Sequence, residues 1–139
     1  MVDIKFRAWH KLNKHMHYNV QDIYCDGELG DCFGDILSTP SKFEVMAYTG
    51  LKDKNGKEIY EGDIVSAKYI YDKRTTDKAQ VIWREDKASF GLKSLKGLTN
   101  EEYELYKITA EHNLEVIGNI YENPELLNKL HYEYRPNKI

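Results

Sequence analysis

The chain of 139 residues has only two cysteines, three prolines and no long hydrophobic run, and these scarcities exclude several classes of protein. Cys25 and Cys32 cannot supply the four ligands of a structural zinc site, and they do not form a C-x-x-C pair. No apolar run has the length needed to cross a bilayer, and the charged opening segment lacks the apolar core of a signal peptide. We therefore expect a cytoplasmic protein with reduced cysteines, although their spacing also permits a disulfide.

The sequence also lacks an excess of positive charge. Lys and Arg total 20 against 23 Asp and Glu, which gives a net charge of −3. The charge is uneven, because residues 1–21 carry four basic residues and one acidic residue (+3), whereas residues 22–35 carry five acidic residues and no basic one (−5). A non-specific nucleic-acid binder usually has a basic domain or stripe. A solvated strand beside a solvated loop explains both segments more simply than two binding sites do.

Motifs of the common enzyme classes are absent as well. The chain has no G-x-S-x-G elbow, no phosphate-binding P-loop and no dinucleotide-binding glycine fingerprint. Four clusters remain as candidates. His15 and His17 could form half of a metal site, and an acidic cluster without the spacing of an EF-hand comprises Asp22, Asp26, Glu28, Asp31 and Asp35. Glu61 and Asp63 are a carboxylate pair around a glycine, and Lys52, Lys54 and Lys57 form a lysine cluster at a hairpin tip.

Each of these clusters also has a simpler structural interpretation. Exposed strand histidines, a solvated acidic loop, turn geometry and a solvated lysine-rich turn explain them without any ligand. We therefore predict no catalytic, cofactor-binding or metal-binding residue, and no enzymatic activity.

Alternating apolar residues and turn signals predict a mainly β fold. Residues 4–20 read as a β-hairpin, and Asn55-Gly56 predicts a two-residue type I′ turn with positive φ at Gly56. Further strands are expected at residues 45–51, 64–71, 81–83, 90–92 and 116–121. A helix is expected near residues 100–108, with Thr99 and Glu102 as a capping box, and a short terminal helix at residues 123–127.

These elements predict a small antiparallel barrel or roll, SH3-like in the C-terminal part, with an N-terminal β-hairpin region and short helices. We expect residues 1–45 to form the hairpin and an irregular acidic loop, residues 46–130 the barrel, and residues 131–139 a polar tail. We expect the boundary between lobes in the glycine-containing segment that follows the hairpin. The expected core comprises Val65, Ala67, Val81, Trp83, Phe90, Leu92, Val116 and Ile120.

Three stretches of this sequence are similar to the YopX family, small proteins of bacteriophages and of prophages in Gram-positive bacteria. They are IKFRAW at residues 4–9 with Met16 after the turn, YTGLKDKNGKEIYEGDIV at 48–65, and EVIGNIYENPELL at 115–127. The resemblance implies an SH3-like barrel in the C-terminal part and a phage-encoded protein that works inside an infected cell. The family has no established activity, so the resemblance carries over no functional residue.

Two functional classes are compatible with these observations. The first is a non-enzymatic module that binds a phage or host protein or associates with itself, for which eleven tyrosines would suit an exposed surface. The alternative is a nucleic-acid-binding accessory of phage replication or recombination, with Trp83 beside Arg84 for base stacking. From the charge balance we expect no tight non-specific binding of nucleic acid, and no membrane association.

Overall fold

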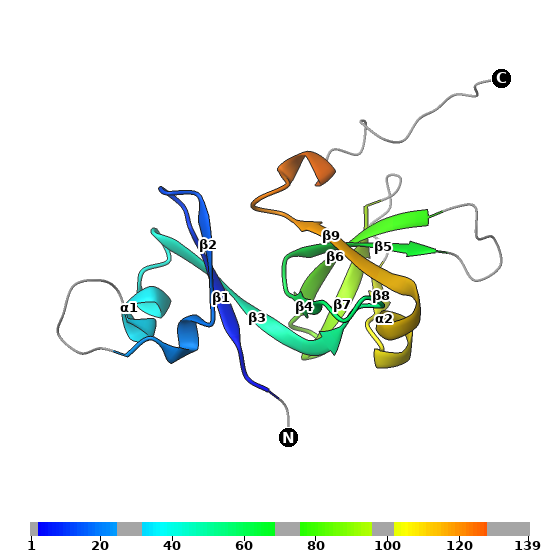
Figure 1. The fold of residues 1–139 in the computed structure, drawn as a ribbon, viewed down its shortest axis with the longest axis horizontal. Helices are drawn as coiled ribbons and strands as arrows, with labels where there is room; N and C mark the ends of the chain where they lie inside the picture. The colour runs from blue at the N-terminus through cyan, green and yellow to red at the C-terminus, as the bar shows by residue number, and fades with distance from the viewer. Residues whose placement is uncertain (1–2, 25–31, 69–75, 96–101, 128–139) are drawn as a thin grey trace. The chain divides into compact units, whose positions relative to one another are not determined.

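A computed structural model describes residues 3–24, 32–68, 76–95 and 102–127 of the chain (Figure 1). The chain divides into two compact units, residues 1–50 and residues 51–139, and the division falls within one long strand. The fold is mainly β, with two antiparallel sheets and a few short helices, as the sequence predicted. No helix within the described ranges is long and apolar enough to cross a membrane.

The first unit is built on an antiparallel sheet with β1 (Phe6–His10) between β2 (His15–Tyr18) and β3 (Phe43–Lys52). The predicted hairpin at residues 4–20 is therefore confirmed as β1 and β2. Strand β3 continues past Gly50, and β4 (Glu58–Tyr60) is its next neighbour in the strand order β2-β1-β3-β4.

One face of this sheet packs against two short helices, η1 (Val20–Asp22) and α1 (Phe33–Ser38). Ala8, Val20, Ile36 and Phe43 form the buried cluster, with Phe6, Phe33 and Val45 packed at its border. The sequence did not predict α1, because the segment has six residues and no extended helical periodicity. Its start is stabilised by Asp35, whose carboxylate accepts a hydrogen bond from the Cys32 backbone N–H at 3.4 Å.

Two expectations for this unit are wrong. Arg7 belongs to the basic segment that was expected to be a solvated strand, but its side chain is only 2% exposed, and Met16 and Met46 on the same face are also buried. Part of the second face is therefore buried as well, although Tyr18 on that face is exposed, and alternation in one strand cannot reveal this. Cys32 is disulfide-bonded rather than reduced, and Cys25 lies outside the described residues.

The second unit contains a five-stranded antiparallel sheet in the order β8-β7-β6-β5-β9. Its strands are β5 (Asp63–Lys68), β6 (Thr76–Arg84), β7 (Ser89–Ser94), β8 (Glu102–Glu104) and β9 (Leu114–Asn119). The helix α2 (Lys107–Asn113) adds Ala110 to the core. The core cluster is Ile59, Val65, Ala79, Val81, Leu92, Ala110, Leu114 and Val116.

Five residues of the expected core are confirmed: Val65, Val81, Leu92 and Val116 are buried, and Ala67 packs at the border. The prediction that Trp83 is in the core is wrong, because 44% of its surface is exposed, and Phe90 and Ile120 are only half-buried. The β5–β6 register explains Trp83. Because Ile64 pairs with Gln80 and β5 begins at Asp63, Trp83 extends beyond the start of its neighbouring strand.

The predicted helix at residues 100–108 is also wrong. Residues 102–104 form strand β8, in which Tyr103 pairs with Leu92 of β7, and helix α2 begins only at Lys107. Pairing with the edge of β7 overrides the local helical signal, and Thr99 lies outside the described residues. The short helix at residues 123–127 is confirmed as the 3-10 helix η2 (Pro124–Leu127), and the predicted strand 64–71 is confirmed as far as Lys68.

Candidate functional site

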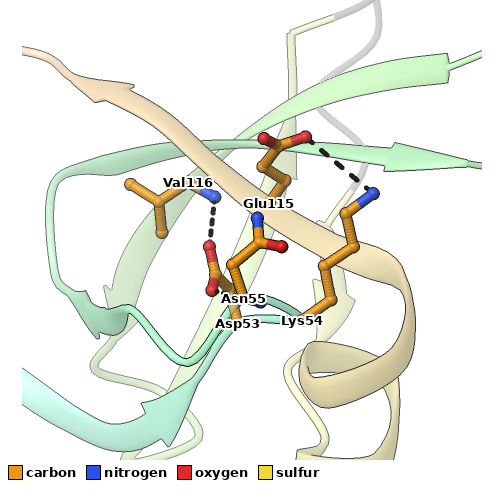
Figure 2. A network of polar contacts seen from close by, with 5 residues as sticks. All are labelled: Asp53, Lys54, Asn55, Glu115 and Val116. Carbon is orange, nitrogen blue, oxygen red and sulfur yellow. Dashed lines mark hydrogen bonds and ion pairs between the residues drawn. The ribbon is translucent and has the colours of Figure 1, made fainter.

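Asp53 is a buried carboxylate that joins the β3–β4 turn to strand β9 (Figure 2). Its Oδ1 accepts hydrogen bonds from the backbone N–H groups of Asn55 and Lys57, both at 2.9 Å, and its Oδ2 accepts from the Val116 N–H at 2.8 Å. The Lys54 N–H also donates to the Leu114 carbonyl at 2.9 Å. We call these contacts the Asp53 bridge. All three hydrogen bonds to the carboxylate come from the backbone, so its role is structural.

The turn beside Asp53 differs from the predicted type I′ turn. Gly56 has a positive φ of 83°, as predicted, but Asn55 does not have the positive φ that type I′ requires. The Gly56 N–H donates to the Asp53 carbonyl, and the Asp53 N–H donates to the Lys57 carbonyl, so the loop has three residues rather than two. The Asp53 carboxylate binds the N–H two residues ahead and so favours this alternative.

Asp63, the second member of the carboxylate pair, is buried in the turn that follows β4. Asp63 is 2% exposed, and its Oδ2 accepts a hydrogen bond from the Tyr60 N–H at 2.7 Å across a turn in which Gly62 has a φ of 89°. The structural interpretation of Asp63 is therefore the one that its geometry supports.

Asn119 shapes the turn after β9 in a similar way. Its Oδ1 accepts from the N–H groups of Tyr121 and Glu122, at 3.0 and 2.8 Å, and its Nδ2 donates to the Glu122 carboxylate at 2.8 Å. A Cβ on Gly118 would lie 2.5 Å from Asn123 Oδ1, so this position needs glycine. Much of the polar character of the stretches 48–65 and 115–127 is thus used to build turns.

The remaining sequence candidates are the lysine cluster and the acidic cluster. In the lysine cluster, Lys54 Nζ lies 3.9 Å from Glu115 Oε1, and Lys52 and Lys57 are exposed. In the acidic cluster, Asp35 belongs to the start of α1 and Asp22 to η1, while Asp26, Glu28 and Asp31 lie outside the described residues. Within the described ranges, no group of three or more His, Cys, Asp or Glu side chains could hold a metal ion.

The histidines lie on one face of the β1–β2 hairpin. His10 pairs directly with His15, and the ring of His17 lies 4.6 Å from that of His15 and 6.4 Å from that of His10. His10 Nδ1 accepts a hydrogen bond from the Asn13 N–H at 3.0 Å, and its ring packs edge-on against Phe43. Partial burial, and then the charges of His15 and His10, lower the pKa of His17. Cross-strand pairing adds His10 to the pair that the sequence had singled out.

Arg84 and Trp83 do not form the joint stacking surface that the sequence suggested. Arg84 is 5% exposed, and its guanidinium pairs with Glu104 at 2.8 Å and with the Ser89 hydroxyl at 3.0 Å. A Cβ on Gly91 would lie 2.6 Å from Arg84 Nε, so Gly91 provides the space for this arginine. Neighbouring residues of a strand point to opposite faces, and Trp83 is therefore on the other side of the sheet.

Trp83 instead belongs to an aromatic face formed by three adjacent strands. Trp83 pairs with Phe90, and Leu92, two residues further on, pairs with Tyr103, so the register places all three aromatic residues on one face. The Trp83 and Phe90 rings make an edge-to-face contact at 5.0 Å. Trp83 and Tyr103 are 44% and 51% exposed. We call Trp83, Phe90 and Tyr103 the aromatic face; no sequence signal could identify it, because it depends on the register of three strands.

The turn next to Trp83 carries more acidic than basic residues. Glu85 and Asp86 are exposed in this turn between β6 and β7, whereas Glu102 and Glu104 alternate with Tyr103 along β8 and point to the opposite face of the sheet. Lys87 is exposed in the same turn, whereas Arg84 is buried against Glu104. This surface therefore offers apolar aromatic area beside negative charge.

Comparison with known proteins places the chain in a family. The crystal structure of protein EF1440 from Enterococcus faecalis is similar over 92% of this chain and 100% of that chain, with 26% sequence identity and a TM-score of 0.63. No curated protein matches the sequence at a significant level. The family described as YopX protein matches residues 5–128, which is most of the chain. The protein therefore belongs to the YopX family.

Proposed function

We propose that this protein is a non-enzymatic protein-binding module, and that the aromatic face is its docking surface. The observation that carries the proposal is the exposure of Trp83, which lies edge-to-face on Phe90 at the surface instead of in the core. Tryptophan and tyrosine contribute strongly to protein interfaces because they bury a large, rigid area at little cost in conformational entropy.

The charges around the aromatic face define the partner further. Glu85 and Asp86 repel phosphate groups, and they attract a protein segment that carries Lys or Arg next to apolar residues. The partner is accordingly a phage or host protein with such a segment, and its site of action is the bacterial cytoplasm. The family resemblance to phage and prophage proteins supports this setting.

The absence of an enzymatic role is part of the same proposal. Asp53, Asp63 and Asn119 are the buried polar residues in the two longest stretches of family resemblance, and each is engaged by backbone groups of nearby turns. A catalytic carboxylate needs access to substrate, and these side chains are at most 5% exposed. We also propose that the second unit is an SH3-like barrel, a fold that presents binding surfaces for many unrelated partners.

A role in binding nucleic acid is the second candidate, because the exposed Trp83 ring could stack on a base. Arg84, the basic residue expected beside it, is engaged elsewhere, as are two basic residues of the first unit. Arg84 is paired with Glu104, Arg7 is buried, and Lys11 lies 3.1 Å from Glu44. These three residues therefore contribute little to displacing the counterions of a nucleic acid, and the net charge of the chain is −3.

Affinity capture from phage-infected cells tests the proposal, with and without nuclease treatment. The variant is Trp83→Ser, and the matched control is Ile108→Ser, which alters another exposed apolar side chain of the same unit. We expect the wild type and the control to retain one protein partner that nuclease does not release, and Trp83→Ser to lose it. Binding is then measured with the purified partner.

Two outcomes would contradict the proposal. Release of the partner by nuclease would favour the nucleic-acid role instead. Equal retention by Trp83→Ser and the wild type would show that the aromatic face is not the docking surface.

A further inference from the structure

Asn55 and Gly56 form an exposed dipeptide at the tip of the β3–β4 turn. The Asn55 backbone N–H is held by Asp53, but the Asn55 side-chain amide makes no hydrogen bond in the described part of the chain. The space next to Gly56 is open, since a Cβ built there would meet no atom within 4 Å. Only the Cβ, Cα and backbone carbonyl carbon of Asn55 separate its side-chain carbonyl carbon from the Gly56 nitrogen, so a bond between the two closes a five-membered ring. Gly56 has no side chain to obstruct their approach.

From this arrangement we infer that Asn55 is a site of spontaneous deamidation, and that the Asp53 bridge controls its rate in the folded protein. The Gly56 nitrogen loses its proton to base and attacks the Asn55 side-chain carbonyl carbon. The new N–C bond closes a five-membered succinimide, and the side-chain nitrogen leaves as ammonia. Water then opens the ring at either carbonyl, which yields aspartate or isoaspartate at position 55. The reaction consumes one water, releases one ammonia and needs no oxidant or enzyme.

The hydrogen bonds of the turn oppose this reaction in the folded state. The N–H of Gly56, whose nitrogen is the attacking atom, donates a hydrogen bond to the Asp53 carbonyl at 3.0 Å. This hydrogen bond opposes removal of the proton by base. The Asp53 carboxylate also holds Asn55 N–H and Lys57 N–H on the two sides of Gly56. Attack therefore requires the turn to open, and Asp53 sets how often it opens.

The other asparagines of the described ranges are less reactive. Asn13, Asn19 and Asn113 are followed by residues with bulky side chains, which obstruct the attack. The side chain of Asn119 is held by three hydrogen bonds, and Asn123 precedes a proline, which has no N–H. Asn55 is the only asparagine of the sequence that a glycine follows.

The product would weaken the bridge that joins the turn to β9. An isoaspartate adds one methylene group to the backbone between position 55 and Gly56, which shifts Lys57 N–H away from Asp53 Oδ1. Either product also adds a carboxylate to a turn that already contains Asp53, with Glu115 on the strand that it joins (Figure 2). The deamidated protein should therefore be less stable than the original.

The experiment incubates the purified full-length protein at mildly alkaline pH and follows every asparagine by peptide mass spectrometry, with isoaspartate detected by enzymatic methylation. The comparisons are a short unstructured peptide with the sequence of residues 52–58, the Asn55→Gln variant and the Asp53→Asn variant. We expect Asn55 to convert before Asn13 and Asn113, several-fold more slowly than in the free peptide, and faster in Asp53→Asn. The isolated isoaspartate form should melt at a lower temperature than the starting protein.

Three results would overturn the inference. The site is wrong if Asn13 or Asn113 converts while Asn55 keeps its amide. Control by the bridge is wrong if folded protein and free peptide convert at the same rate, or if Asp53→Asn, shown to be folded by circular dichroism, converts no faster than the wild type. A product with an unchanged melting temperature would overturn the structural consequence.

Discussion

At the residue scale, the molecule uses its buried polar side chains as substitutes for backbone hydrogen-bonding partners. Asp53, Asp63 and Asn119 each accept hydrogen bonds from main-chain N–H groups at turns that would otherwise leave those donors unsatisfied. A buried donor without a partner is costly, so these residues are needed even though they carry no chemistry.

Replacement of Asp53 tests this view directly. Asp53→Ala leaves three backbone N–H groups without their acceptor, one of them on a core strand, and should lower the free energy of unfolding by about 3 kcal/mol. Lys54→Ala is the matched control, because it removes only an exposed ion pair of 3.9 Å and should change stability by less than about 0.5 kcal/mol. Urea unfolding measures both. Equal effects of the two substitutions would contradict the role of Asp53.

Gly56 is a residue whose backbone conformation decides what can replace it. Gly56→Val should reduce the free energy of unfolding by about 1–2 kcal/mol, since a β-branched residue resists a φ of 83°. Gly56→Asn is the control, because asparagine tolerates the left-handed region better than valine does. No atom lies within 4 Å of the added Cβ, so a difference between the two variants reports backbone strain rather than collision. Thermal unfolding of both variants is the measurement.

At the scale of elements, His17 makes the stability of the β1–β2 hairpin depend on pH. Burial and the neighbouring imidazoles lower the pKa of His17 from its usual 6.5, so the unfolded chain binds this proton more tightly than the folded hairpin. The contribution of His17 to stability is therefore constant above about pH 6.5 and decreases as the pH falls below that value.

The measurement for His17 is the melting temperature as a function of pH. The wild type and His17→Thr are compared, so that the titration of carboxylates common to both proteins cancels. We expect the wild type to lose more stability than the variant between neutral and mildly acidic pH. Parallel curves for the two proteins would show that His17 has no such effect.

Strand β9 contributes both to the core of the second unit and to the Asp53 bridge. Its Val116 side chain is in the core cluster while its Val116 N–H is bound by Asp53. Val116→Asp introduces an unpaired carboxylate into that core and should cost at least about 3 kcal/mol, with loss of the folded state. Near-ultraviolet circular dichroism and thermal unfolding test it, with the neighbouring Glu115→Gln as control. An unchanged melting temperature of Val116→Asp would contradict the placement of β9.

At the scale of the whole molecule, the distribution of charge argues against tight non-specific binding of nucleic acid. The chain has 20 basic and 23 acidic residues, and Arg7 and Arg84 are buried. We expect no saturable binding of single- or double-stranded DNA or RNA in fluorescence-anisotropy titrations at neutral pH and moderate salt. Micromolar or tighter binding that weakens steeply with added salt would reverse the order of our two proposed functions.

The sequence by itself determined the parts of this protein that depend on neighbouring residues. The alternation in residues 4–20, the positive φ of Gly56 and the short helix after Asn123 all follow from local steric and hydrogen-bonding preferences. The same locality explains why the stretches that resemble the YopX family identified the family without revealing a site: much of their polar character serves turns.

Tertiary structure decided everything that depends on pairing between distant strands. Residues 102–104 form a strand because they pair with the edge of β7. Trp83 is exposed because β5 starts at Asp63 and does not extend alongside Trp83. Arg84 and Trp83 point to opposite faces of the pleated strand, and Arg84 pairs with Glu104. Asp53 accepts its third hydrogen bond from Val116 on β9, 63 residues away in the sequence. Local preferences are worth a fraction of a kcal/mol per residue, whereas one satisfied buried donor or one paired strand edge outweighs them.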